Sequence, residues 1–95
     1  MSSRLVWPAK DPDEVLDYLL DWSAVPLENG ETISESTWES DVSGIAIGSS
    51  SIVDCSTVVW LSGGVAGTSY KLTNHIVTSE AREYDQSVTI RVKDL

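Results

Sequence analysis

Two stretches towards the C-terminal end of the chain alternate strictly between core-forming and solvent-facing residue types. From Tyr70 to Ile76, the residues Tyr, Leu, Asn and Ile are separated by Lys, Thr and His. The same period of two returns from Val88 to Val92. A period of two places one face of a strand on a core and the other in water. These stretches therefore predict two amphipathic strands of an antiparallel hairpin, joined by the polar segment 79–85.

The remainder of the chain also favours strands. Val, Ile and Thr supply 24 of the 95 residues, and β-branched side chains pack well on a pleated surface. The Cys–Trp–Cys pattern of antibody domains is absent. Short strands at regular spacing, without a long helix, predict an all-β fold: an Ig-like antiparallel β-sandwich of about six or seven short strands. The further strands are expected at residues 32–38, 42–47 and 56–61, with an edge-like segment at 52–54 and a tight reversal at 63–67.

The segment 11–22 fits two patterns. Asp11, Pro12 and Glu14 are typical of a helix start, with an N-cap, a proline at the first position and an acid three residues after the cap. Residues 16–22, however, alternate almost as a strand does. We expect a short helical turn near residues 11–15 followed by a strand. Residues 1–10 then form an N-terminal arm, and residues 11–95 form a single Ig-like β-sandwich domain.

The predicted core collects the large apolar residues on the inward faces of these strands. Burying each is worth about 1.5–3 kcal/mol, so a dozen can support a domain of this size. The predicted core residues are Leu16, Tyr18, Leu20, Trp22, Ile33, Val59, Leu61, Tyr70, Leu72, Ile76, Val88, Ile90 and Val92.

The charge of the chain is strongly negative. Fifteen Asp and Glu residues stand against six Lys and Arg, a formal net charge of −9. This balance argues against binding to nucleic acid, which needs clustered basic residues, and against binding to an anionic membrane surface. Most of the acids lie in the first half of the chain, in segments 11–17, 28–31 and 35–41. We expect these segments to be loops and turns, which either keep the protein soluble or face a basic partner.

The sequence contains few of the residue patterns that are typical of catalytic sites. The single cysteine, Cys55, cannot form an internal disulfide, and the chain is expected to be soluble in a reducing compartment. The single histidine, His75, is expected at the surface of a strand, without the nucleophile of a hydrolase motif. The glycine-rich segment 62–67 lacks the Lys of a phosphate loop, and the acids of 11–17 lack the glycine of a calcium loop. No catalytic residue, cofactor or metal site is predicted, and the protein is not expected to be an enzyme.

Four tryptophans are the remaining candidates for a functional role. Trp22 and either Trp38 or Trp60 are expected in the core. Trp7 lies in the predicted arm, where it either docks on a partner or packs against the domain itself.

Seven segments of the chain form a pattern: KDPDEVLDY at 10–18, DWS at 21–23, ETI at 31–33, VWLSGG at 59–64, AGTSY at 66–70, TN at 73–74 and SVTIRV at 87–92. Together these segments resemble a family of small tailed-bacteriophage and prophage virion proteins, the fiber–tail adaptor family. The resemblance covers most of residues 10–92. It departs from the family pattern at Glu31, where the family has Asp, and at the acidic turn 79–84.

The resemblance implies a non-enzymatic structural adaptor of a phage or prophage virion. Such a protein links the tail or neck to a fiber or a neighbouring subunit, in several copies, after assembly in the host cytoplasm. It binds its neighbours through a docking arm or through a sheet edge that accepts a partner strand. We take Trp7, Trp60, Gly63 and Gly64 as candidate partner-binding residues. The alternative is a carbohydrate-binding module that stacks a sugar on Trp60 or Trp38.

Overall fold

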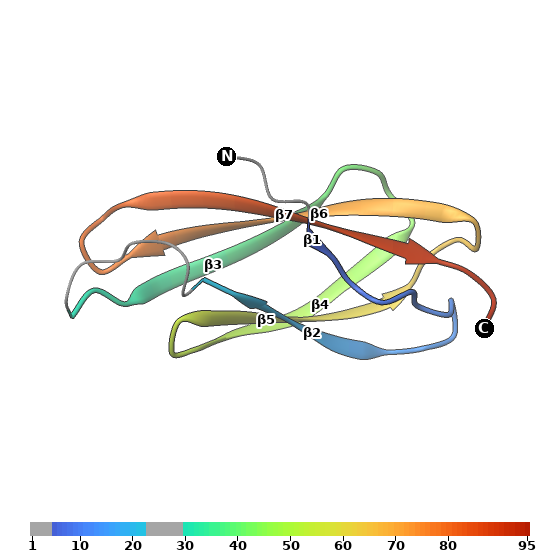
Figure 1. Ribbon diagram of the computed structural model, residues 1–95, viewed down its shortest axis with the longest axis horizontal. Coiled ribbons are helices and arrows are strands. Elements are labelled where there is room, and N and C mark those ends of the chain that lie inside the picture. Colours follow the sequence, from blue (N-terminus) through green and yellow to red (C-terminus); the bar gives the residue numbers. More distant parts are fainter. Residues whose placement is uncertain (1–4, 23–29) are drawn as a thin grey trace.

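The computed structural model describes residues 5–22 and 30–95, which form two stacked β-sheets (Figure 1). No described residue belongs to a helix, so the described part of the chain contains no helix that could cross a membrane. The strands are β1 (Leu5–Val6), β2 (Leu16–Asp21), β3 (Ile33–Ser40), β4 (Ile45–Val53), β5 (Ser56–Gly63), β6 (Thr68–Thr78) and β7 (Glu83–Val92).

The strands divide into a four-stranded sheet, in the order β1-β7-β6-β3, and a three-stranded sheet, in the order β2-β5-β4. Figure 1 shows β6 and β7 in the upper layer and β2 and β5 in the lower. All neighbours are antiparallel except β1 and β7, which run parallel. The predicted all-β sandwich is therefore confirmed. Residues 5–10 of the predicted arm run alongside β7, and Lys10 forms an isolated bridge with Val92.

The hairpin predicted from the strict alternation is confirmed as β6 and β7. The predicted connecting segment 79–85 was too long, because β7 already begins at Glu83. His75 lies opposite Asp85, and Val77 lies opposite Glu83. Polar residues on the outer face of a sheet give the same pattern as a polar loop, so the sequence alone did not locate the end of the turn.

The strand predicted at 42–47 and the separate segment at 52–54 are wrong in their boundaries. Residues 45–53 form one strand, β4, in which the pairing with β5 shifts register between Ile47 and Ser50, while residues 42–44 and 54 lie in the turns at its ends. Such a bulge inserts an extra residue without ending the strand. At the bulge, a Cβ on Gly48 would lie 3.3 Å from the backbone oxygen of Trp60, so the glycine permits the close approach of β4 to β5.

Both parts of the expectation for residues 11–22 are confirmed. Glu14 donates its N–H to the Asp11 carbonyl at 3.0 Å, and the Glu14 carboxylate accepts the Asp11 N–H at 2.9 Å. The Asp11 carboxylate accepts the N–H of Asp13 at 2.8 Å. These are the hydrogen bonds of a capped first helical turn. The turn ends there, and the chain continues into β2.

Twelve of the thirteen predicted core residues are buried among the described residues. The prediction of a buried Leu16 was wrong, because Leu16 begins the edge strand β2 and is 38% exposed. Ile45 and Trp38 belong to the core, and Trp60 does not. The buried apolar residues are Tyr18, Leu20, Trp22, Ile33, Trp38, Ile45, Val59, Leu61, Tyr70, Leu72, Ile76, Val88, Ile90 and Val92.

One buried polar residue connects the two sheets. The Asn74 side chain, on β6, accepts hydrogen bonds from Trp22 Nε1 at 2.9 Å and Thr57 Oγ1 at 2.6 Å. It donates to Ser36 Oγ at 2.9 Å and to the Thr37 carbonyl at 2.8 Å. Asn74 therefore uses both donors and both acceptor positions of its amide and ties β3 and β6 to β5 and the end of β2.

Candidate partner-binding surfaces

Trp60 lies on the outer face of the three-stranded sheet. It occupies the central strand β5, in which Thr57, Val59 and Leu61 point to the core. Because side chains alternate along a strand, the indole of Trp60 points away from the core, and the residue is 42% exposed. Large apolar residues on a solvent-facing sheet surface are candidates for contact with another molecule.

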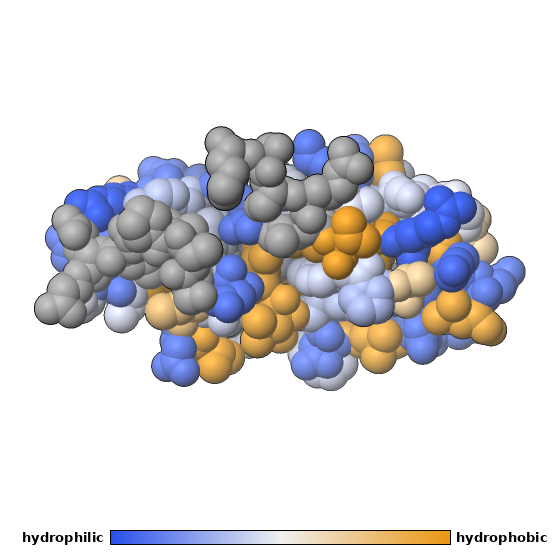
Figure 2. Space-filling view, viewed as in Figure 1, coloured by the Kyte–Doolittle hydropathy of each residue, from blue (hydrophilic) through white to orange (hydrophobic). Residues whose placement is uncertain are grey.

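Other apolar residues share this face with Trp60 and gather around Val58, two residues before it on β5. Leu19 of β2 lies opposite Val58 and is 54% exposed. Val53 of β4 lies diagonally across from Val58 and is 51% exposed. We call Leu19, Val53, Val58 and Trp60 the outer patch. Figure 2 shows apolar residues, in orange, along the lower side of the molecule where β2 and β5 lie, interspersed with hydrophilic ones.

An acidic side chain lies at the edge of the outer patch. Asp17 of β2 is directly opposite Trp60 in the strand register and is exposed. Side chains in directly opposed positions lie about 4.5–5.5 Å apart at their Cβ atoms. The patch therefore presents an apolar centre with a negative charge beside it.

The pair Gly63 and Gly64 forms part of the crossing from β5 in one sheet to β6 in the other. Both have positive φ, 70° and 98°, which favours glycine. A Cβ on Gly64 would lie 2.7 Å from a methyl carbon of Val92, and the Gly64 N–H donates to the Gly44 carbonyl at 3.1 Å. Backbone conformation thus favours glycine at both positions, and packing against Val92 requires it at Gly64 as well. The exposed residue of this turn is the neighbouring Val65.

Lys10 holds the N-terminal residues to this turn. Its ammonium donates to the carbonyls of Asp11 and Gly63, both at 2.8 Å, and the residue is fully buried. Burial lowers the pKa of Lys10, and the nearby carboxylates of Glu14 and Asp11 oppose that shift. The burial of this lysine could not be predicted from the sequence, because a single lysine beside acidic residues is usual at a surface.

Trp7 packs on the domain itself in this structure. Its ring stacks on Tyr18 with 4.7 Å between ring centroids and lies 5.8 Å from the ring of Trp38. Its backbone N–H donates to the Thr89 carbonyl at 3.0 Å. Among the described residues, the Tyr18 hydroxyl and the Trp38 indole N–H are buried without a hydrogen-bond partner. This packing gives Trp7 a structural role. Its partner-binding role stays a prediction.

His75 lies on the outer face of the four-stranded sheet, at the surface, as expected. Its two ring nitrogens contact the carboxylates of Asp85 and Glu83. The hydrogen bond to Asp85 is the main cause that raises the pKa of His75 above its ordinary value. Two neighbouring carboxylates favour the protonated imidazole, whose charge offsets part of theirs.

The acidic segment expected as a loop at 35–41 is mostly strand. Residues 35–40 belong to β3, at one end of the four-stranded sheet. The acidic segment 11–17 forms the capped turn and the start of β2, and residues 28–29 lie outside the described residues.

Comparison with known protein families gave one finding that bears on these surfaces. Residues 10–91 match the family model described as podophage GP4 fiber-tail adaptor protein gp77. The matched residues include the capped turn, strands β2 to β6, and all but the last residue of β7. A comparison with curated proteins found no match.

Proposed function

The chain belongs to the podophage fiber-tail adaptor family, and on that premise we propose that it is a non-enzymatic virion adaptor. In this role it links the tail or neck of the particle to a fiber or a neighbouring subunit by protein–protein contacts. The family match over residues 10–91 is the observation that carries the proposal.

The outer patch supports a contact with another virion protein. The patch includes an exposed tryptophan, and tryptophan is among the residue types most often found at the energetic centre of an interface. Trp60 sits on the central strand of its sheet, so the surface that carries it is held on both sides by β2 and β4. A partner suited to this surface has apolar side chains at its centre and a basic residue opposite Asp17.

The other candidate residues fit the adaptor role in different ways. Trp7 is partly exposed beside Tyr18, so a partner could extend the aromatic stack. Gly63 and Gly64 shape the turn that presents Val65, an exposed apolar residue. We propose Trp7, and the turn of Gly63, Gly64 and Val65, as further partner contacts.

The proposal also specifies where and how the protein works. Several copies in one particle would let individually weak contacts add up to a stable assembly. The protein would be made and assembled in the host cytoplasm and then reside in the virion. Its net charge of −9 disfavours nucleic acid and anionic membranes as partners.

The adaptor role is tested by binding of the purified chain to the purified tail and fiber proteins of the same phage. The wild-type chain should bind at least one of them in sedimentation experiments. Trp60→Ser should weaken that binding by about 30-fold, the effect of losing a hot spot of about 2 kcal/mol. Val42→Ser is the matched control, because Val42 is an exposed apolar residue outside the outer patch.

The outcomes separate two conclusions. A wild-type chain that binds neither the tail nor the fiber protein would overturn the adaptor role. A Trp60→Ser chain that folds and binds as wild type does would remove the outer patch from the interface and leave the adaptor role standing.

A carbohydrate-binding module is the second candidate. The exposed ring of Trp60 on a sheet face favours it, whereas Trp38 is buried in the core and offers no sugar platform. The test is a glycan array. Binding that is lost in Trp60→Ser would support this candidate, and an array without binding would reject it.

A further inference from the structure

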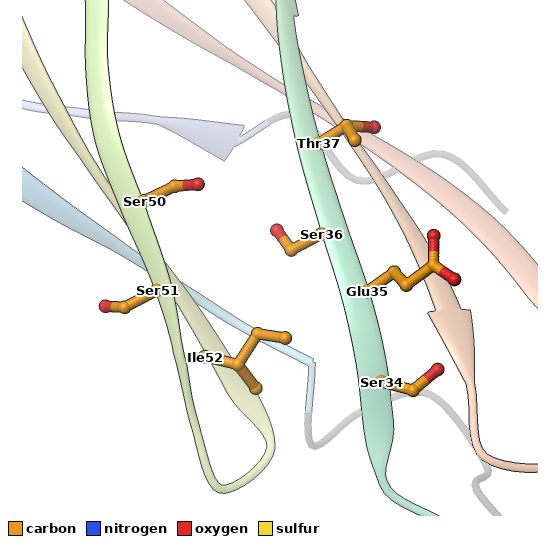
Figure 3. Close-up of a pocket in the computed structure, with 7 residues that line it drawn as sticks. All are labelled: Ser34, Glu35, Ser36, Thr37, Ser50, Ser51 and Ile52. Atoms are coloured by element: carbon orange, nitrogen blue, oxygen red, sulfur yellow. The ribbon is translucent and has the colours of Figure 1, made fainter.

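The two sheets of the sandwich each end in an edge strand on the same side of the molecule. β3 is the last strand of the four-stranded sheet, and β4 is the last strand of the three-stranded sheet. A groove of about 340 Å³ lies between them, lined by residues of both strands (Figure 3). No described strand pairs with β3 on the side that faces this groove.

The hydrogen-bonding pattern shows which backbone groups of β3 face away from β6. The Asp41 N–H donates to the Lys71 carbonyl at 3.1 Å, and the register from there back to Glu35 is unbroken. In an antiparallel pair, residues alternate between bonding to the neighbouring strand and facing away from it. The N–H and carbonyl groups of Ser36, Trp38 and Ser40 therefore point to the free edge.

Edge strands are normally protected from pairing with other chains. The usual protections are charged side chains, above all lysine, a proline on the edge strand, a bulge, or a covering loop. β3 has eight residues without lysine or proline, and its one register shift lies at its start, between Ile33 and Glu35. By contrast, β4 is interrupted in its middle by the shift between Ile47 and Ser50. β3 is thus the regular edge that a further strand could extend.

The side chains along this edge define what such a strand must carry. Figure 3 shows Ser36, Ser50 and Ile52 pointing into the groove, and Glu35 pointing away from it. Ser36 and Ser50 are small, so they leave room for the inward side chains of an added strand. Glu35 and Glu39 are exposed on the outer face, about 13 Å apart along the strand, and neither forms an ion pair among the described residues.

We propose that the free edge of β3 accepts an extended segment of a neighbouring virion protein as an additional strand of the four-stranded sheet. That segment would carry Lys or Arg at two outward positions four residues apart, beside Glu35 and Glu39, and its inward residues would have small side chains that enter the groove. The inference rests on the proposed adaptor function and names a contact separate from the outer patch. Backbone hydrogen bonds would supply affinity, and the alternating side chains would supply selectivity.

Amide hydrogen exchange of the full chain, alone and with the purified tail and fiber proteins of the same phage, tests this proposal directly. The amides of Ser36, Trp38 and Ser40 should exchange at least about tenfold more slowly in the complex. Those of Thr37 and Glu39, already bonded to β6, should change little. This alternation distinguishes strand addition from simple coverage of the surface, which would slow exchange without a period of two.

Two variants add a second readout. The double change Glu35→Lys and Glu39→Lys should weaken binding about tenfold at low salt, with a smaller effect at high salt. Glu80→Lys is the matched control, because Glu80 is exposed on the β6–β7 turn, outside the free edge of β3. Ser40→Pro removes an edge-facing N–H without removing a bond to β6, so it should also weaken binding.

Each outcome decides one question. If the chain binds the tail or fiber protein while the three edge amides exchange as in the free chain, the β3 contact is wrong and the adaptor function stands. If the double glutamate variant binds as Glu80→Lys does, the basic partner strand is wrong. If the wild-type chain binds neither protein, the adaptor function itself fails. Should Ser40→Pro not fold, the glutamate variant and the exchange pattern still decide the result.

Discussion

Replacing Asn74 by alanine should destabilise the domain by about 4 kcal/mol, although the change removes no large apolar group. The side chain amide of Asn74 makes four hydrogen bonds, two of them to donors in the interior. Those two donors, Trp22 Nε1 and Thr57 Oγ1, belong to residues that are 1% and 0% exposed. Without Asn74 they have no acceptor in the described network.

The magnitude follows from the burial of each former partner. A buried donor that loses its partner costs about 1–3 kcal/mol, so two such donors cost about 4 kcal/mol together. Ser36 adds little, because it is half-buried beside the groove, where water can replace the lost bond. For a domain of this size, 4 kcal/mol corresponds to a fall in Tm of roughly 15–30 °C.

Urea denaturation of four proteins separates this cause from general damage to the core. Thr57→Val removes a donor and keeps the volume of the side chain, so in the wild-type chain it should cost about 1 kcal/mol. In the Asn74→Ala chain the same change removes a hydroxyl that has lost its acceptor, and it should stabilise by about 1 kcal/mol. The predicted effect of Thr57→Val therefore changes sign between the two backgrounds.

Two results would refute the reasoning. A loss below about 1 kcal/mol for Asn74→Ala would mean that the buried donors find other partners at little cost. Equal effects of Thr57→Val in both backgrounds would mean that Thr57 and Asn74 are not energetically coupled, whatever their distance.

Three further predictions concern other parts of the fold. Gly64→Ala should cost about 2–3 kcal/mol in urea denaturation and Gly67→Ala about 1 kcal/mol, because both glycines have positive φ but only the first has a neighbouring methyl group in the way; equal losses would exclude the clash. The pKa of His75, measured by NMR, should lie above 6.5 and should fall in the Asp85→Asn chain, and a pKa at or below 6.5 would contradict the pairing. The protonated imidazole should stabilise the fold fully below pH 6.5, and this stabilisation should be lost as the pH rises through the folded-state pKa. Trp7→Ala should lower the free energy of unfolding by about 2 kcal/mol by removing an aromatic stack and exposing the rings beneath it, and an unchanged urea midpoint would show that the stack contributes nothing.

The sequence predicted those parts of the fold that depend on local alternation. The faces of β6 and β7 follow from a period of two, which also placed Asn74 on the inward face. The capped turn at Asp11 follows from residue types at fixed spacing, and it formed as expected. In these cases the relevant interactions lie within a few residues of each other along the chain.

The parts that were not predicted depend on pairing between distant segments. Whether Trp38 or Trp60 points inward depends on the register of β3 and β5 in their sheets, and both strands alternate about equally well. The bulge in β4 is fixed by its pairing with β5, and a run of serines carries no periodic signal for it. The acids at 35–39 have the composition of a loop, yet they occupy an edge strand, because an edge strand has polar surroundings on more than one side.

The two proposed contacts lie on different sheets, and this separation bears on how an adaptor can hold two neighbours. The outer patch belongs to the three-stranded sheet and is apolar, whereas the β3 edge belongs to the four-stranded sheet and is acidic. Different chemistry on separate surfaces would allow two partners to bind without competing for the same residues. The Asn74 network runs between these surfaces, since its amide bonds to Ser36 on the edge strand and to Thr57 on the strand that carries Trp60. A fixed orientation of one sheet on the other would then fix the angle between the two partners, so the interior hydrogen bonds would set the geometry of the joint as well as the stability of the domain.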